Sequence, residues 1–200
     1  GSWLDFEFDS KDILYFRIDK KRKIPITTLL RAIDMSSENI IDTFYDKIEI
    51  FATKNGWASK FNFENIIGKK LSHDLIDAAT NEVVLKEGTK MNKKTVGKLV
   101  DQKFENYILT DDNLLGYAIA TDLVDSETGE VLLESGSLIT TETLEVLDNL
   151  NFKSLNVINP AKSNIGPYLY NTLLVDKNSD QKEALNDIYK TIRLGEAPAS

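Results

Sequence analysis

Hydrophobic and polar residues alternate at the start of the chain, which predicts a β-strand. Trp3 shares one face of this strand with two acids, and the purely apolar side chains share the other face. Residues 9–12 (Asp-Ser-Lys-Asp) have turn chemistry, and residues 13–18 are rich in β-branched and aromatic residues. The pattern therefore predicts a β-hairpin. Its apolar face would comprise Leu4, Phe6 and Phe8.

Apolar residues at helical spacing predict helices on both sides of the middle of the chain. Pro25 suits the first turn of a helix whose apolar positions are Ile26, Leu29, Leu30 and Ile33. Ser36-Ser37 supplies an N-cap for a second helix with its apolar side at residues 40–45. Near the end, Asp180 and Glu183 resemble a capping box, and Gly195 ends that helix. Its expected buried stripe is Ala184, Leu185, Ile188, Tyr189 and Ile192.

The middle of the chain contains an internal repeat. The segment "LIDAATNEVVLKEGTKMNKKTVGKLVDQKF" begins at Leu75, and "LVDSETGEVLLESGSLITTETLEVLDNLNF" begins at Leu123, 48 residues later. Each copy (75–109 and 123–157) is expected to form strand, Asx-type turn, strand, helix and strand. The helices are expected near residues 92–102 and 140–149. A duplicated β-β-α-β unit would make a small β-rich domain.

Length and composition fit a globular protein of one or two domains. The 200 residues are 42% hydrophobic and 28% charged, which is ordinary for such a chain. The absence of Cys excludes disulfides and thiolate metal sites and fits a reducing, cytoplasmic compartment. No apolar run approaches the roughly 20 residues of a membrane span, and no signal peptide is visible. Without an initial Met, the chain is expected to be an excised piece of a longer protein.

Charge is distributed unevenly, although the formal net charge is −8. All thirteen cations of residues 47–165 are Lys, and eighteen acids give that stretch a net charge of −5. The window from Arg17 to Arg31 instead holds six cations against one Asp. Arg is well suited to phosphate because its planar fork donates two hydrogen bonds. A nucleic-acid contact is therefore expected in this amino-terminal window and not in the acidic middle.

The residues alone nominate no catalytic or metal site. The single His, His73, is expected to be a surface loop residue, and one His without Cys makes a zinc site improbable. Gly68-Lys69-Lys70 lacks the earlier glycine of a phosphate-binding loop, because Phe63 occupies that position. The repeated acids are explained by hairpin turns rather than by acid–base chemistry. These are Asp77, Glu82, Asp125 and Glu130.

Two features of the predicted hairpin leave alternatives open. Trp3 lies on the polar face, where its ring either covers a neighbouring domain or stacks against a nucleic-acid base. The run Lys20-Lys21-Arg22-Lys23 is either a solvated strand-to-helix junction or a phosphate-binding surface.

Several segments resemble consecutive parts of the bacterial RNA polymerase β subunit, within its second lobe domain. They are "GSWLDFEFD", "RIDKKRKIP", "TTLLRAI", "GPYL", "TLLVD" and "ALNDIYKTIR" followed by "GE". The resemblance is strong over residues 1–46 and 166–200. Residues 47–165 are similar, more loosely, to an insertion that some bacteria carry in that lobe. The resemblance implies an α+β fold in which the hairpin and helices of the lobe (1–46 and 166–200) are interrupted by an inserted β-rich domain.

The resemblance also implies a function in DNA-templated RNA synthesis, as one part of a nucleotidyltransferase. The family's catalytic carboxylates and Mg²⁺ belong to the β′ subunit, so no catalytic residue, metal or cofactor is expected here. The lobe forms a wall of the downstream DNA channel and faces the non-template strand. The family's Trp stacks on a base of that strand, which implies this role for Trp3. The matching basic segment implies phosphate contacts from Arg17, Lys20, Lys21, Arg22 and Lys23.

The partners implied are DNA (the non-template strand and the downstream duplex), the β′, α and ω subunits and a σ factor. A regulator is expected to bind residues 47–165, no membrane contact is expected, and the location would be the bacterial cytoplasm, with the nucleoid. The alternative is a free-standing cytoplasmic protein-binding module built on the duplicated unit. A parent reading frame of well over a thousand codons would favour the polymerase.

Overall fold

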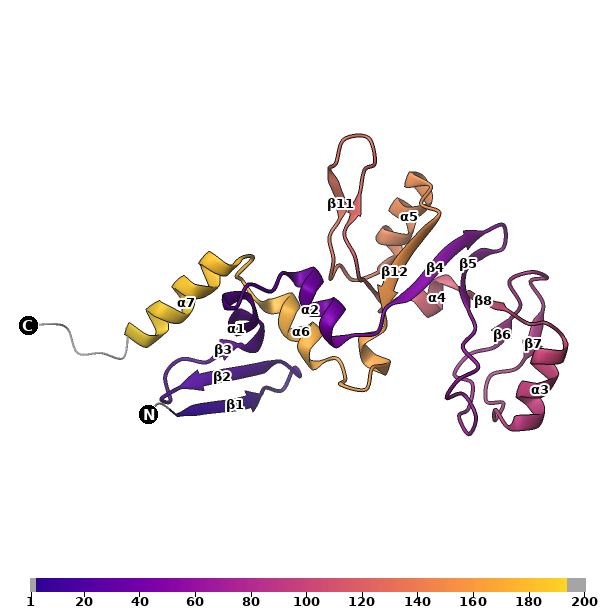
Figure 1. The fold of residues 1–200 in the computed structure, drawn as a ribbon, viewed down its shortest axis with the longest axis horizontal. Coiled ribbons are helices and arrows are strands. Elements are labelled where there is room, and N and C mark those ends of the chain that lie inside the picture. Colours follow the sequence, from indigo (N-terminus) through magenta and orange to yellow (C-terminus); the bar gives the residue numbers. More distant parts are fainter. Residues whose placement is uncertain (1–2, 194–200) are drawn as a thin grey trace, which may run out of the picture. The chain divides into compact units, whose positions relative to one another are not determined.

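The computed structural model describes residues 3–193 and divides the chain into two compact units, each assembled from separated segments. The first unit comprises residues 1–47, 118–137 and 158–200, and the second comprises residues 48–117 and 138–157. Both mix helices with antiparallel strands, so the α+β prediction is confirmed (Figure 1). None of the described helices is both long and apolar enough to cross a membrane.

The first unit contains a three-stranded sheet, a short hairpin and several helices. Its strands are β1 (Leu4–Phe8), β2 (Leu14–Ile18), β3 (Ile24–Pro25), β9 (Ala118–Ile119), β10 (Leu123–Val124) and β11 (Val131–Leu133). Its helices are α1 (Ile26–Ala32), α2 (Ser37–Phe44), the 3₁₀ turn η1 (Pro160–Lys162), α6 (Tyr168–Val175) and α7 (Gln181–Arg193).

The predicted amino-terminal hairpin is confirmed as β1 and β2, which pair antiparallel with Phe6 opposite Phe16. The turn forms because the Asp9 carboxylate accepts hydrogen bonds from the backbone N–H groups of Lys11 and Ile13. Phe16 is fully buried, whereas the apolar row of β1 lies on the surface. The exposed fractions in this row are 48% for Leu4, 58% for Phe6 and 59% for Phe8.

The two helices that follow the hairpin begin close to the expected residues. Ser36 caps α2 with a reciprocal capping box to Asn39, as the Ser36-Ser37 pattern predicts. In α1 the predicted apolar stripe is only partly right, because Ile33 is 64% exposed. The most buried side chains of α1 are instead polar, namely Thr27, Thr28 and Arg31.

Helix α7 begins where the capping pattern predicts, but its buried face differs from the predicted stripe. The Glu183 backbone N–H donates to the Asp180 carboxylate, 2.8 Å away. Ala184 and Thr191 are buried, whereas Leu185 and Tyr189 are largely exposed, so their predicted burial is wrong. The inward face of α7 instead carries polar side chains, because they form hydrogen bonds with other segments of the first unit. The predicted helix end at Gly195 lies outside the described residues.

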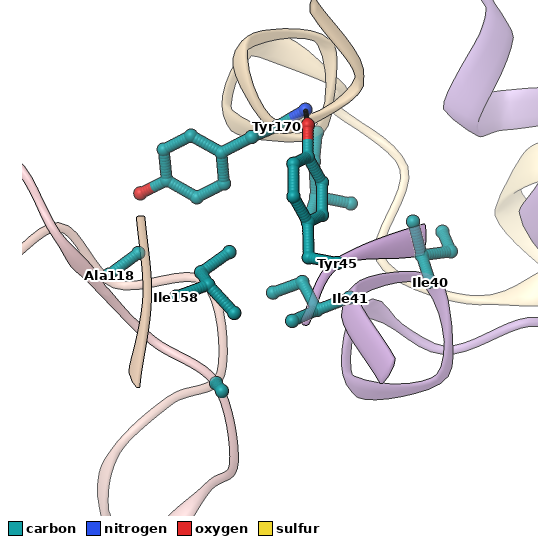
Figure 2. Close-up of a cluster of buried hydrophobic side chains, with 8 residues drawn as sticks. Ile40, Ile41, Tyr45, Ala118, Ile158 and Tyr170 are labelled. Carbon is teal, nitrogen blue, oxygen red and sulfur yellow. Dashed lines mark hydrogen bonds between the residues drawn. The ribbon is translucent and has the colours of Figure 1, made fainter. Parts of the chain in front are cut away.

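An apolar cluster joins the three separated segments of the first unit (Figure 2). The Tyr170 hydroxyl donates to the Gly136 carbonyl at 2.8 Å, and the Tyr170 backbone N–H donates to the Tyr45 hydroxyl at 3.0 Å. Burial, together with the neighbouring Tyr45, raises the pKa of Tyr170 to about 12. The cluster contains Ile40, Ile41, Tyr45, Ala118, Ala120, Ile158, Tyr170 and Leu173.

The second unit contains a sheet in which four strands follow the order β8-β5-β4-β12. A separate apolar cluster lies beneath the β6–β7 hairpin and helix α3, and it includes Phe61, Met91 and Leu99. The strands of this unit are β4 (Ile48–Thr53), β5 (Gly56–Lys60), β6 (Leu75–Ile76), β7 (Val83–Leu85), β8 (Asn106–Leu109) and β12 (Ser154–Ile158, whose last residue falls in the first unit). Its helices are α3 (Lys93–Asp101), α4 (Asp111–Leu114) and α5 (Thr141–Leu150).

The two segments of the internal repeat have the same local hydrogen bonds. Leu75 pairs with Leu85 in the β6–β7 hairpin, and Leu123 pairs with Leu133 in β10–β11, with the same register shift after the first pair. The elements occur in the same order, β6-β7-α3-β8 and β10-β11-α5-β12. The two compact units nevertheless divide the second segment, because β10–β11 belongs to the first unit and α5 to the second. The predicted domain boundaries at residues 46/47 and 165/166, which describe a family insertion, stay a prediction.

Candidate nucleic-acid interface

The hairpin end that carries Trp3 is closed by hydrogen bonds to the turn after β2. The Trp3 backbone N–H donates to the Asp19 carboxylate at 2.8 Å, and the Asp19 N–H donates to the Trp3 carbonyl at 2.9 Å. Asp19 and Lys20 both have left-handed backbone conformations, with φ values of 50° and 60°. This tight turn holds the Lys20 backbone beside Trp3, at the end of a paired strand.

Trp3 and Lys20 line one surface hollow together with two carboxylates, those of Asp5 and Asp19. The Trp3 side chain is 75% exposed, which leaves its ring accessible. The Lys20 ammonium makes no hydrogen bond or ion pair with another described residue. The exposed ring offers a stacking surface for an uncharged base, and the Lys20 ammonium offers a contact for a phosphate.

The other predicted cations have partners within the first unit. The Arg17 side chain forms an ion pair with Glu7 and also donates to the Lys21 carbonyl at 2.9 Å. The Lys23 ammonium lies 4.3 Å from the centroid of the Tyr15 ring, in a cation–π contact. These contacts reduce what Arg17 and Lys23 offer to an external phosphate.

Lys21 and Arg22, in the middle of the basic run, form hydrogen bonds with helix α7. The Lys21 ammonium donates to the Ile192 carbonyl at 2.7 Å, in the last turn of α7, where a cation is favoured by the helix dipole. Arg22 donates from Nη2 to the Asp187 carboxylate at 2.6 Å and to the Thr191 hydroxyl. Burial opposes ionisation of Asp187, but hydrogen bonds from Asn178 and Arg22 outweigh it and lower its pKa.

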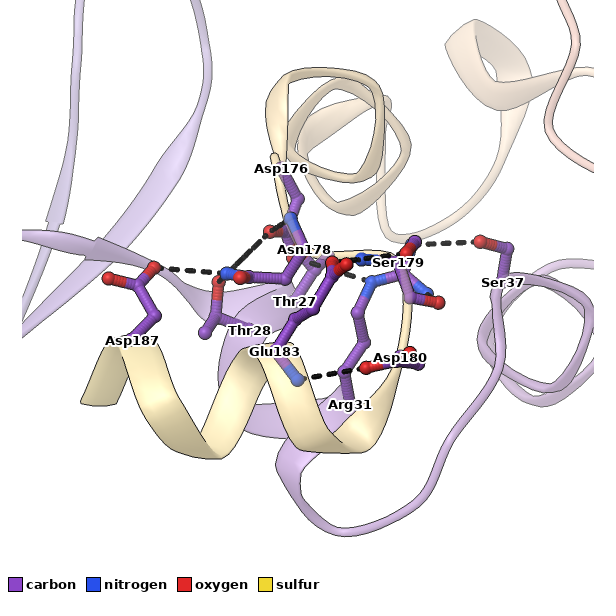
Figure 3. A network of polar contacts seen from close by, with 10 residues as sticks. All are labelled: Thr27, Thr28, Arg31, Ser37, Asp176, Asn178, Ser179, Asp180, Glu183 and Asp187. Atoms are coloured by element: carbon purple, nitrogen blue, oxygen red, sulfur yellow. Dashed lines mark hydrogen bonds and ion pairs between the residues drawn. The ribbon is translucent and has the colours of Figure 1, made fainter. Parts of the chain in front are cut away.

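Arg31, the last cation of the basic window, is buried and unavailable to any external ligand. Its side chain is 6% exposed and lies 3.5 Å from the fully buried Asp176 carboxylate. Asp176 also accepts hydrogen bonds from the hydroxyls of Thr27 and Thr28, at 2.6 and 3.1 Å. Figure 3 shows that this polar network continues through Asn178 to Asp187.

The structure therefore separates the six predicted DNA-binding residues into two groups. Trp3 and Lys20 lie together at the exposed end of the hairpin, and Arg17, Lys21, Arg22 and Lys23 are engaged elsewhere. Sequence reasoning missed the partners of the held cations. The i, i+4 spacing of Asp187 and Thr191 marks a polar helix face, but nothing in the sequence connects that face to Arg22.

The remaining candidates from the sequence have structural explanations. His73 is exposed in a loop, as predicted. The Asp77 and Asp125 carboxylates accept backbone hydrogen bonds in their hairpin turns, which confirms the turn interpretation. The bonds from Thr128 and Glu127 lower the pKa of Asp125. Among residues 3–193 no group of three or more His, Asp or Glu side chains could hold a metal ion.

Comparison with known proteins places these features in a family. Residues 1–169 match the family described as RNA polymerase Rpb2, domain 2. The chain is 43% identical over 199 residues to the DNA-directed RNA polymerase subunit beta of Ehrlichia chaffeensis, and 49% identical to that of Rickettsia bellii. The match covers 100% and 98% of this chain, respectively, and 14% of each relative's length. The chain therefore belongs to the RNA polymerase Rpb2 domain 2 family.

Proposed function

We propose that the chain acts as part of the β subunit of a bacterial DNA-directed RNA polymerase. The names of the relatives support this proposal, and the chain spans only about 14% of their length. The catalytic carboxylates and Mg²⁺ would belong to the β′ subunit, and this chain would contribute binding surface. Its partners would be the β′, α and ω subunits, a σ factor and DNA, in the bacterial cytoplasm.

Within that enzyme, the hairpin end formed by Trp3 and Lys20 would contact the non-template DNA strand and form part of the wall beside the downstream duplex. The observation that carries this proposal is the exposed Trp3 ring beside a free ammonium, fixed by the Asp19 hydrogen bonds. Stacking of a base on an aromatic ring contributes about 1–3 kcal/mol and tolerates any sequence. A polymerase that moves along its template requires such sequence tolerance.

The sharpest test is photo-crosslinking in a transcription complex assembled with the complete β subunit. A non-template strand with 5-iododeoxyuridine near the downstream edge of the bubble should crosslink to Trp3. Trp3→Ala should abolish the crosslink, and Trp3→Phe, which keeps a ring, should retain part of it. An undiminished crosslink in Trp3→Ala would contradict the proposed contact.

We also infer that residues 75–109 and 123–157 are two copies of one β-β-α-β unit. Hydrogen bonds that match at a spacing of 48 residues support this inference: Asp77 N–H donates to the Glu82 carbonyl, and Asp125 N–H donates to the Glu130 carbonyl.

The copies would belong to an insertion over residues 47–165 that binds a regulator. Deleting this insertion should leave basal RNA synthesis intact and change the response to that regulator. Loss of basal synthesis in a correctly assembled enzyme would contradict this role.

A further inference from the structure

The two repeat segments differ sharply in charge although their hydrogen bonds correspond. Residues 75–109 carry six lysines and five acids, whereas residues 123–157 carry one lysine and seven acids. At the spacing of 48 residues, Lys86 corresponds to Glu134 and Lys94 corresponds to Glu142. The net charge of the middle of the chain is therefore a sum over one weakly basic copy and one strongly acidic copy.

Five lysines gather where the chain leads into helix α3, and four of them belong to the basic copy, whereas Lys70 precedes it. Lys70 and Lys90 are partners in an isolated antiparallel bridge, which places their side chains on the same side of the backbone pair. Asn92 caps α3 immediately afterwards, with Lys93 and Lys94 in the first turn and Lys98 one turn later. These five exposed residues, Lys70, Lys90, Lys93, Lys94 and Lys98, are called the lysine surface.

Acidic neighbours do not neutralise the lysine surface. Within residues 3–193, no carboxylate oxygen lies within 4.0 Å of these five ammonium groups. Lys86 lies outside the surface and is paired with Asp74 at 4.0 Å. The five positive charges are therefore available to a partner.

Lys93 and Lys94 do not stabilise the helix that carries them, although Lys98 in its last turn is favoured by the helix dipole. Cations in the first turn oppose the helix dipole, and like charges four residues apart, as at Lys94 and Lys98, repel each other. The acidic copy has the favourable arrangement, with Glu142 in the first turn of α5. Hydrogen bonds from its own backbone N–H and from the Thr140 side chain lower the pKa of Glu142. The stability of the helix therefore does not explain the lysine at the matching position of α3, Lys94, and binding to a partner would explain it.

We propose that the lysine surface binds the phosphates of duplex DNA. The surface contains no aromatic side chain for stacking, which disfavours a single strand as its ligand. Lys is depleted from the buried centres of protein interfaces, which disfavours a protein as the ligand. Lys binds phosphate as a point charge, which gives a sequence-independent and salt-dependent contact. The contact is separate from the one proposed for Trp3.

The test measures how salt affects the binding of duplex DNA to RNA polymerase assembled with the complete β subunit. The probe is a labelled 30-base-pair duplex, titrated by fluorescence anisotropy at several KCl concentrations. The patch variant is Lys90→Glu with Lys94→Glu. The matched control, Lys54→Glu with Lys153→Glu, makes the same change in net charge at exposed lysines outside the surface. Assembly of each enzyme is checked by gel filtration.

Each lost phosphate contact lowers the slope of log K against log salt by about 0.9 for duplex DNA. The patch variant should therefore lose about 2 units of slope relative to wild type, and the control should lose less than half of that. If the Glu variant does not assemble, Lys90→Gln with Lys94→Gln should show the same loss of slope. Equal slopes and affinities in patch and control variants would overturn the proposal and favour an acidic protein as the partner. Trp3→Ala should leave this duplex affinity unchanged, so the two proposals can fail separately.

Discussion

The basic window of the first unit contains similar charges in opposite situations. Arg31 is buried against Asp176, and Arg22 is held by Asp187 on helix α7. Lys20 instead extends from a tight turn beside the exposed ring of Trp3, without a charged partner among the described residues. A cluster of cations in a sequence therefore does not measure the charge available to a ligand. Here most of the cluster binds other parts of the first unit, and Lys20 remains for an external ligand.

Breaking the buried Arg31–Asp176 pair should have the strongest effect on stability. Asp176→Ala leaves the Arg31 charge buried without its partner and removes the acceptor for two buried Thr hydroxyls. The loss in free energy of unfolding should be about 3–5 kcal/mol, measured by urea denaturation. The exposed control, Asp5→Asn, should change it by less than about 0.5 kcal/mol. Equal stability of Asp176→Ala and wild type would show that the network does not hold the first unit.

The second prediction compares two phenylalanines that face each other across β1 and β2. Phe16 is fully buried, so Phe16→Ala should cost about 3–5 kcal/mol of unfolding free energy. Phe6 is 58% exposed, so Phe6→Ala should cost less than about 1 kcal/mol. Similar losses for both variants would mean that β1 packs differently from the arrangement described.

The third prediction separates Arg22 from Lys20. Arg22→Ala breaks a partly exposed ion pair and should lower the unfolding free energy by about 1 kcal/mol or less. Lys20→Ala should leave stability unchanged and reduce the salt slope for single-stranded DNA by about 0.7. The two measurements are urea denaturation of the chain and anisotropy of a labelled non-template strand in the transcription complex. A larger change in the salt slope for Arg22→Ala than for Lys20→Ala would contradict the description of Arg22 as held and Lys20 as free.

A weaker effect is a pH dependence of stability at Asp187, the partner of Arg22. The pKa of Asp187 is lower in the folded chain, so its contribution to stability is present above its unfolded pKa of about 3.9 and is lost as the pH falls through the lower folded value. Asp187→Asn removes this contribution. The stability difference between wild type and Asp187→Asn should therefore be largest near neutral pH and shrink below about pH 4. A difference that grows on acidification would contradict the assigned sign.

Local patterns predicted much of this fold. The alternation around Phe6, the Ser36 cap and the turn at Asp125 each depend on residues close in sequence, and the structure bears them out. The burial of α7 could not be predicted in the same way. Its inward face carries Asp187 and Thr191 because they bind Arg22, which lies 165 residues from Asp187 in the chain.

The candidate site was predictable only as a set of residue types. Sequence alone places Trp3 on the polar face of a strand and counts the cations nearby. Which cation is free depends on long-range contacts, such as Lys21 with the Ile192 carbonyl, and on the left-handed turn at Asp19 and Lys20. Such tertiary contacts leave no periodic signal in a single sequence.

If the proposed contact is right, Trp3, at the exposed end of the hairpin, stacks on a base of the non-template strand, while Arg17, Lys21, Arg22 and Lys23 do not contact DNA. The most direct measurement uses 2-aminopurine in that strand at the downstream edge of the bubble, in a complex containing the complete β subunit. Stacking on Trp3 quenches the fluorescence of this base. Trp3→Ala should therefore brighten it, and Arg22→Ala should leave it unchanged. Unchanged fluorescence in Trp3→Ala, or equal brightening in both variants, would contradict the account.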